Sequence, residues 1–422
     1  MFKRIVRRDG SVIIFFPQKE TKAVTFEVLY KVGSRLENKA LNGASHFVEH
    51  LMFKGTNRRP NTADISKELD NVGAEYNAFT GKEYTGYYIT VDSSHLPLAV
   101  DMLSDMLHNS KFEKIEVDRE RGVIVEEINM YEDNPLLYIE DAFEELLFEN
   151  SDLGPSIAGP RINIQTVSRD ALYDYYKKHY FSGNGVIAIA GKFNEKRALK
   201  LVDRLFPLQK KKPRNKFVRV KFPVQKKPRV KLVKRSLEQV QLMLGFRSVA
   251  SSDKRFLASQ VLANILGGNM SSRLFLNIRE RRGLCYSIKS SLSGYQDSSA
   301  FVVQAGLNKD KIYEALTAIK EELNILVKDG VSQEELKKAK DNMRGRMILK
   351  MESAPTYLNF LLGQEIINQP IKDLEAKLKE LDKVTLKQVN DMAKIIISWS
   401  QSNLAIMGPF ENTSKFLNIL TK

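Results

Sequence analysis

An internal repeat constrains the fold of this chain more than any other feature of the sequence. The stretch from Asn184 to Phe193 matches the stretch from Asn403 to Phe410 at an offset near 217 residues, and both read as buried apolar strands. At a similar offset, the predicted helix from Val331 to Ser353 takes the place of the predicted helix from Glu113 to Asp133. The 422 residues are enough for two domains of about 200 each, so the repeat predicts two homologous halves.

Helical and strand-like segments alternate within each half. Residues 24–30 read as a strand, for example, and Pro97 begins a helix that runs to His108. We therefore expect an α+β fold of two homologous domains, each a largely antiparallel sheet packed with helices. The expected boundaries are residues 1–206 for the first domain, 207–235 for a basic linker and 236–422 for the second domain.

The positive charge of the chain is concentrated in that linker. Of a formal net charge of +15, the stretch from Lys210 to Arg235 supplies 13 Lys or Arg and no Asp or Glu, which leaves +2 for the rest. A basic stretch of this kind is most simply a solvated connector, and we expect no nucleic-acid partner. Binding of RNA or of an anionic surface through the linker stays as an alternative, although no RNA-binding motif occurs elsewhere.

Two of the five histidines, His46 and His50, lie four residues apart with Glu49 between them. On a helix both imidazoles can point at one metal ion, while Glu49 is rotated roughly 60° from the line between them. A zinc hydrolase needs this set, because the ion acidifies a water molecule and the carboxylate takes its proton. The order HxxEH is the inverzincin signature.

A third protein ligand is expected for catalytic zinc. The predicted helix Glu113–Asp133 offers Glu120, Glu126 and Glu127. Glu120 and Glu127 are seven residues apart and share a face, whereas Glu126 points about 100° aside. One carboxylate would bind the metal and another would hold a ligand in place, and the pattern does not decide which does which. At the repeat offset HxxEH falls on Ala263–Gly267, so we expect no metal in the second half.

HxxEH is followed by Glu127 after 76 intervening residues, with Glu120 seven residues before it. Together with four further runs, this spacing resembles the pitrilysin/insulinase family of zinc peptidases across nearly the whole chain. The likeness is strongest to the branch that holds the catalytic subunit of the mitochondrial processing peptidase and its bacterial relatives. The four runs are Phe53–Thr56, Gly73–Thr80, Ser271–Phe275 and Gly283–Tyr286.

The resemblance assigns roles to particular residues. It implies one Zn²⁺ per chain, with Glu49 as the general base and Glu120 supporting the ligands. It also implies that Arg279 and Tyr286 from the second half hold substrate carbonyls and the developing oxyanion. An extended peptide would pair with an edge strand by β-augmentation. The implied metal ligands are His46, His50 and Glu127, and the implied edge strand contains Asn77, Ala78 and Phe79.

The expected function is that of a zinc metalloendopeptidase that cleaves unfolded peptides or presequence-like oligopeptides in an enclosed chamber. The resemblance implies one of two forms, because pitrilysin/insulinase members of this length are homodimers or heterodimers. In the heterodimers one subunit holds the zinc motif and the other holds the pair that corresponds to Arg279 and Tyr286 here, the Arg-Tyr pair. This chain carries both sets, so we expect a homodimer. A non-catalytic or weakly active structural or partner subunit is the alternative, and such a subunit would be expected to have lost HxxEH.

Cys285 is the single cysteine, which excludes an internal disulfide and fits a reducing compartment. No run approaches 18 apolar residues, so we expect no membrane span. The N-terminal apolar run Val12–Phe16 is too short for a secretory signal. These features indicate a cytoplasmic protein of bacterial type, although they do not exclude the loss of a targeting peptide.

Overall fold

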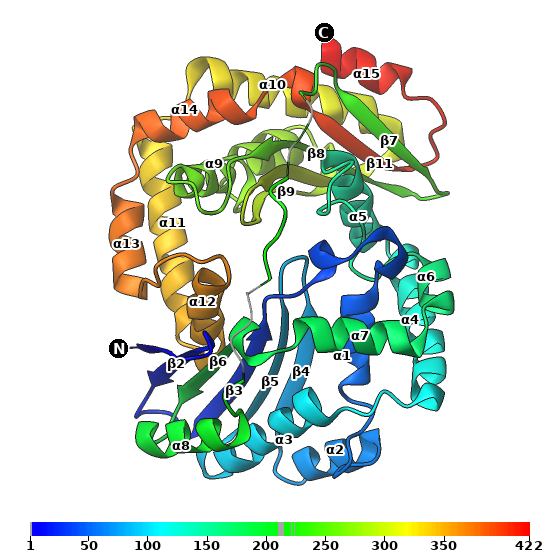
Figure 1. Cartoon of the computed structure of the whole chain (residues 1–422). Coiled ribbons are helices and arrows are strands. Elements are labelled where there is room, and N and C mark those ends of the chain that lie inside the picture. The colour runs from blue at the N-terminus through cyan, green and yellow to red at the C-terminus, as the bar shows by residue number, and fades with distance from the viewer. Residues whose placement is uncertain (1, 210–214, 221, 223) are drawn as a thin grey trace. The chain divides into compact units, whose positions relative to one another are not determined.

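The computed structural model describes residues 2–209, 215–220, 222 and 224–422 (Figure 1). The predicted linker residues 210–214, 221 and 223 therefore lie outside the described residues. The chain forms two compact units, each assembled from three segments. The first comprises Met1–Asn129, Pro155–Val218 and Lys350–Asp373, and the second comprises Met130–Gly154, Arg219–Leu349 and Leu374–Lys422.

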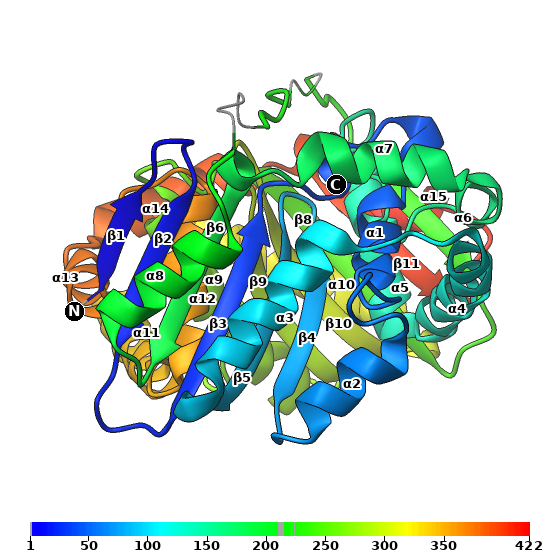
Figure 2. The ribbon, with the colours of Figure 1, turned by 60° about the horizontal axis from the view of Figure 1, so that its bottom comes forward.

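A six-stranded sheet with the order β1-β2-β6-β3-β5-β4 forms the centre of the first unit (Figure 2). β2 and β6 run parallel, and the other neighbouring pairs run antiparallel. The sheet is therefore largely antiparallel, as predicted. The strands are β1 (Lys3–Val6), β2 (Val12–Pro17), β3 (Ala23–Tyr30), β4 (Glu75–Thr80), β5 (Thr85–Asp92) and β6 (Gly185–Gly191).

Helices pack on both faces of this sheet. On one face, Phe47 of α1 and residues of α3, α7 and α8 form a core with Phe26 and Tyr87, whose side chains are fully buried. On the other face, Leu358 and Leu362 of α12 pack against the strands. The helices are α1 (Ala44–Leu51), α2 (Thr62–Asp70), α3 (Leu96–Asn109), α4 (Lys114–Asp133), α6 (Arg161–Thr166), α7 (Arg169–His179), α8 (Glu195–Leu205) and α12 (Ala354–Ile366).

The second unit repeats this plan with a five-stranded sheet of order β7-β11-β8-β10-β9. β7 and β11 run parallel, and the other pairs run antiparallel. The strand order matches β2-β6-β3-β5-β4 of the first sheet, so the α+β fold with two homologous sheets is confirmed. The strands are β7 (Arg229–Lys234), β8 (Gln239–Ser248), β9 (Cys285–Gly294), β10 (Ser299–Asn308) and β11 (Asn403–Gly408).

Five helices of the second half follow the order of their counterparts in the first half. The helix α9 stands at the position of α1, and α10, α11, α14 and α15 stand at the positions of α3, α4, α7 and α8. Their apolar side chains bury one face of the second sheet. The helices are α9 (Phe256–Gly267), α10 (Ile312–Asp329), α11 (Gln333–Met351), α13 (Leu374–Asp382), α14 (Leu386–Ile396) and α15 (Ser414–Thr421).

Each sheet also receives one helix from the other half of the chain. The helix α5 (Pro135–Leu147) follows α4, yet its residues Ile139 and Phe143 pack on Met243 and Ala405 of the second sheet. The helix α12 follows α11 and packs on the first sheet. Each compact unit therefore contains segments from both sides of the predicted linker 207–235. The predicted bounds of the two homologous domains stay a prediction. Arg229–Lys234, which the sequence assigns to the linker, form β7.

Among the helices that the structure describes, none combines the length and the apolar character needed to span a membrane.

Candidate metal centre

His46, His50 and Glu127 lie together in the first unit, at the contact of α1 with α4. One potential ligand atom from each residue lies within 4.8 Å of those of the other two. The two Nε2 atoms are 3.2 Å apart, and each lies 3.4 Å from Oε2 of Glu127. Phe47, Val48 and Leu51 of α1 are buried in the core, which fixes the face of the helix that the histidines occupy.

The triangle of these three atoms has the size that a tetrahedral zinc site requires. An ion with ligand distances of about 2.0–2.1 Å separates its ligand atoms by roughly 3.3–3.4 Å. The three observed separations are 3.2, 3.4 and 3.4 Å. Two imidazoles and a carboxylate also form a common donor set for catalytic zinc. The residues present therefore fit the ion.

Glu120 determines which nitrogen of His50 faces the cluster. Oε1 of Glu120 lies 2.9 Å from Nδ1 of His50, so that nitrogen donates a proton and Nε2 of the neutral ring keeps its lone pair for a metal. Oε2 of Glu120 lies 2.6 Å from Nζ of Lys54. Burial works to raise the pKa of Glu120, but the hydrogen bonds from His50 and Lys54 outweigh it and lower the pKa. Glu120 therefore stays ionised.

The two histidines differ in their affinity for a proton. Burial, aided by the charge of His50, lowers the pKa of His46 to about 4. Burial also acts to lower the pKa of His50, but Glu120 and Glu127 outweigh it and raise the pKa to about 9. The carboxylates of Glu120 and Glu127 therefore favour positive charge at His50, and the same carboxylates would favour a bound cation.

Glu49 lies beside the cluster and is held by Thr80 at the end of β4. The Thr80 hydroxyl donates to Oε2 of Glu49 at 2.5 Å. Burial raises the pKa of Glu49, and the hydrogen bond from Thr80 partly offsets this rise. A carboxylate whose pKa is raised towards neutrality is a better acceptor for a proton from water. The sequence analysis did not single out Thr80, although it lies within the run Gly73–Thr80.

The structure separates the three glutamates of α4 that the sequence left open. Glu127 points to the histidines, and Glu120 is 3% exposed and bonds to His50. Glu126 is exposed to solvent. This placement agrees with a helical register in which Glu120 and Glu127 share a face.

Glu37 caps the first turn of α1 from outside the helix. The helix begins after Gly43, whose φ of 102° is readily adopted only by glycine and which has no side chain to act as a cap. The carboxylate of Glu37 accepts hydrogen bonds from the backbone N–H groups of Gly43 at 2.8 Å and Ser45 at 2.6 Å. Sequence reasoning missed Glu37, because an acceptor six residues before the N-cap residue Gly43 follows no local capping pattern.

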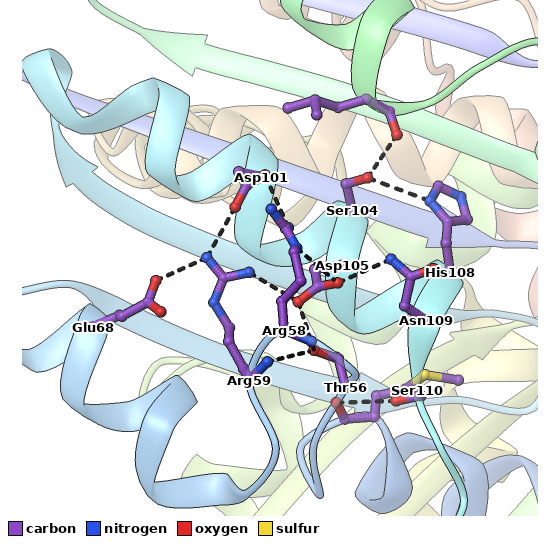
Figure 3. A network of polar contacts seen from close by, with 12 residues as sticks. Thr56, Arg58, Arg59, Glu68, Asp101, Ser104, Asp105, His108, Asn109 and Ser110 are labelled. Carbon is purple, nitrogen blue, oxygen red and sulfur yellow. Dashed lines mark hydrogen bonds and ion pairs between the residues drawn. The ribbon is translucent and has the colours of Figure 1, made fainter.

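A buried network of charged residues holds the loop that follows α1 (Figure 3). Asp105 of α3 accepts hydrogen bonds from the Thr56 hydroxyl at 2.6 Å and from Arg59 at 2.9 Å. Nη2 of Arg59 also lies 2.8 Å from Oε2 of Glu68 and 2.9 Å from Oδ2 of Asp101. The same loop carries Lys54, whose ammonium group contacts Glu120.

The predicted substrate strand lies at an edge of the first sheet. Within the described part of the chain, β4 is the last strand of the order and pairs with β5. Asn77 is exposed, and Ala78 and Phe79 are partly exposed. β4 is therefore an edge strand, and the Ala78 N–H on it donates to Oδ1 of Asn77 at 2.9 Å.

Arg279 and Tyr286 lie together in the second unit. Arg279 belongs to a π-helical turn, Phe275–Glu280, and its guanidinium carbon lies 4.6 Å from the ring centre of Phe275 and 5.8 Å from that of Tyr286. Tyr286 is 76% exposed. Their roles towards a substrate stay predictions.

Two models of one peptidase family match the chain. Residues 13–161 match the model described as insulinase, peptidase family M16. Residues 166–343 match the model described as the peptidase M16 inactive domain. The first match contains HxxEH and Glu127, and the second contains Arg279 and Tyr286.

Curated relatives and solved structures extend the likeness over the whole chain. An uncharacterized zinc protease of Bacillus subtilis is 33% identical, with 98% of this chain and 99% of the relative covered. An uncharacterized zinc protease of Streptomyces coelicolor is 34% identical, with 97% of this chain and 90% of the relative covered. The fold is shared with a protease from Helicobacter pylori at a TM-score of 0.89 and 22% identity, with 97% and 99% covered. A peptidase M16 inactive domain from Pseudomonas fluorescens matches at a TM-score of 0.89 and 18% identity, with 97% and 98% covered.

Proposed function

Because the chain belongs to peptidase family M16, we propose that it is a zinc-dependent metalloendopeptidase that cleaves unfolded peptides or presequence-like oligopeptides. The single observation that carries this proposal is the triangle of two Nε2 atoms and one carboxylate oxygen, of tetrahedral size, with Glu49 beside it. The relatives' description as zinc proteases supports the same reading.

His46, His50 and Glu127 would hold one Zn²⁺ per chain, and Glu120 would keep Nε2 of His50 free for it. Bound zinc supplies Lewis acidity, which lowers the pKa of water and polarises a carbonyl group. Glu49 accepts the proton of the attacking water and returns it to the leaving amine as the peptide bond breaks. Thr80 holds the carboxylate of Glu49 in place during both transfers.

The edge strand β4 accounts for a preference for unfolded peptides. An extended peptide can add to β4 through backbone hydrogen bonds at Asn77, Ala78 and Phe79, whereas the backbone of a folded protein is already paired. Thr80 is the last residue of β4 and bonds to Glu49, so a peptide that pairs with β4 would lie close to Glu49. Arg279 and Tyr286 would bind substrate carbonyls. We also propose a homodimer, because the chain carries both the zinc motif and the Arg-Tyr pair, and a cytoplasmic location, because the single cysteine fits a reducing compartment.

A non-catalytic partner subunit is the second candidate, because 166–343 match a model described as inactive. The match begins after HxxEH and Glu127, so the residues of the candidate metal centre lie outside it. An RNA-binding or surface-binding role of the basic linker is less favoured. Three basic residues of β7 already pair with glutamates: Arg229 with Glu149, Lys231 with Glu145 and Lys234 with Glu411.

Mass spectrometry of products from a mixed peptide library, with and without a chelator, tests the proposal. We expect internal cleavage that stops on chelation and returns with Zn²⁺. A stably folded protein in the same assay should stay intact. Cleavage that persists in the chelator would rule out the zinc mechanism, and zinc-loaded protein that cuts no peptide would favour the partner-subunit reading.

A further inference from the structure

The turn that follows β4 connects the proposed base to the rest of the unit. Thr80 bonds to Glu49 and is followed directly by the turn Gly81–Tyr84, in which the Gly81 N–H donates to the Tyr84 carbonyl at 2.8 Å. A shift of this turn would move Thr80 away from Glu49. Whatever fixes the turn therefore also fixes the carboxylate.

A loop between β3 and α1 packs against the back of this turn. The N–H groups of Ser34 and Arg35 donate to the carbonyls of Gly81 at 3.2 Å and Lys82 at 2.9 Å. The approach is so close that a Cβ on Gly33 would lie 2.3 Å from the Gly81 oxygen. Glycine is therefore required at this contact.

The side chain of Arg35 ties the turn to the connector. Its guanidinium has no exposed surface, and Nη1 lies 2.6 Å from Oε1 of Glu83 in the turn. Nη2 donates to the Val218 carbonyl at 3.0 Å, and the ring of Phe217 covers the guanidinium with its centre 5.1 Å away. Each of these contacts helps to solvate the buried charge, so the loss of one should shift the guanidinium.

The connector is anchored to the same unit just before these residues. Asn215 donates from Nδ2 to the Lys31 carbonyl at 2.9 Å and from its backbone N–H to Oδ1 of Asn184 at 3.3 Å. The segment 215–218 therefore packs on the first unit in a defined position. The side chains of Lys216 and Val218 are exposed, as expected of a solvated connector, so the contacts of this segment with the unit are made by its backbone and by Asn215 and Phe217.

We propose that Phe217 and Val218 of the connector act through Arg35 and Glu83 as a clamp that positions Thr80 against Glu49. Phe217 and Arg35 are then positioning residues for the proposed reaction, and the connector does more than join the domains. This inference rests on the proposed function.

Phe217→Ala, alone and combined with Thr80→Val, tests the clamp in zinc-loaded full-length protein. We expect Phe217→Ala to lower kcat about three- to tenfold and to change KM by less than about twofold, because it displaces Thr80 and the carboxylate of Glu49 and leaves the rest of the edge strand, Glu75–Phe79, in place. In the Thr80→Val background the same substitution should lower kcat by less than about twofold, because the link to Glu49 is already broken. In a Thr80→Ser background, which keeps the hydroxyl, Phe217→Ala should again lower kcat about three- to tenfold.

Arg4→Gln is the matched control. It breaks a two-point ion pair with Glu365 at the opposite edge of the same sheet, so it should lower stability and leave kcat unchanged. Hydrogen exchange of the segment 80–84 gives a readout without activity: Phe217→Ala should speed exchange there, and Arg4→Gln should not. Unchanged exchange, or equal kcat effects of Phe217→Ala in both backgrounds, would overturn the clamp. A zinc-loaded wild type without peptidase activity would overturn the proposed function itself.

Discussion

Glu27 on β3 and Met243 on β8 occupy the same position in the two homologous sheets. Glu27 lies between Ala188 and Tyr88 of the neighbouring strands, and Met243 lies between Ala405 and Gln304. Met243 is part of an apolar core. Glu27 is equally buried at 1% exposed, and its Oε1 has no hydrogen-bond partner among the described residues. The first sheet therefore carries a carboxyl group where the second carries a thioether.

This carboxyl group should make the stability of the protein depend on pH. Burial raises the pKa of Glu27 from 4.5 to about 8. Below about pH 4.5 the group is neutral in both states, and as the pH rises to 8 it ionises only when unfolded. Its contribution to stability is therefore lost progressively above about pH 4.5 and is gone once the pH has risen through about 8. Relative to wild type, Glu27→Gln should gain on the order of 3 kcal/mol between pH 5 and pH 8 in denaturant titrations.

Glu75→Gln is the control for that comparison. Glu75 lies on the edge strand of the same sheet and is exposed, so its carboxylate is hydrated in both states. Glu75→Gln therefore measures what the same change of side chain does at an exposed position, and the effect of burial is the difference between the two variants. A stability difference between Glu27→Gln and wild type that does not change with pH would mean that water or a cation solvates Glu27 in solution.

The sequence predicted those features that rest on local spacing. HxxEH placed two imidazoles on one helix face, and the repeat predicted both sheets, because strand and helix periods are properties of short segments. The seven-residue spacing of Glu120 and Glu127 predicted their common face but left their roles open. Assigning a role to each glutamate required the position of His50 relative to α4, which depends on tertiary packing.

Contacts between distant segments were not predictable. Glu37 and Thr80 reach α1 from a loop and from a strand end, and neither follows a capping or catalytic motif. The exchange of α5 and α12 between the sheets was also missed, because an apolar helix of 13 residues can bury its surface on either sheet. Only the packing of Phe143 and Leu362 shows which sheet each helix covers.

His50→Ala should remove the zinc. It leaves two protein ligands, which rarely hold catalytic zinc. Elemental analysis of the purified protein should fall from about one zinc per chain to near zero. A stoichiometry unchanged in His50→Ala would refute the ligand assignment.

Glu127→Gln should lower zinc occupancy far more than Glu126→Gln. The two residues are adjacent on α4, but only Glu127 faces the histidines, whereas Glu126 is exposed. Competition with a chromophoric chelator gives the two affinities under the same conditions. Greater sensitivity at Glu126 would show that α4 has a different register in solution.

Glu49→Gln should keep zinc and fold but lose peptide hydrolysis. The amide cannot accept the proton of the attacking water, and a general base contributes roughly two to four orders of magnitude in rate. Steady-state kinetics on a quenched fluorescent peptide, together with zinc analysis, separates the two properties. Turnover close to that of wild type would mean that another group acts as the base.

Glu37→Ala should weaken zinc binding although Glu37 touches no ligand. It leaves the N–H groups of Gly43 and Ser45 without their acceptor, at a cost of about 1–3 kcal/mol, and loosens the helix turn that carries His46. Asn61→Ala is the matched control, because Asn61 caps α2 of the same unit and its loss should cost about 1 kcal/mol of stability without changing zinc affinity. Urea denaturation and zinc titration of both variants measure the two effects. If Glu37→Ala lowered stability but bound zinc as tightly as Asn61→Ala, the cap would serve the fold alone.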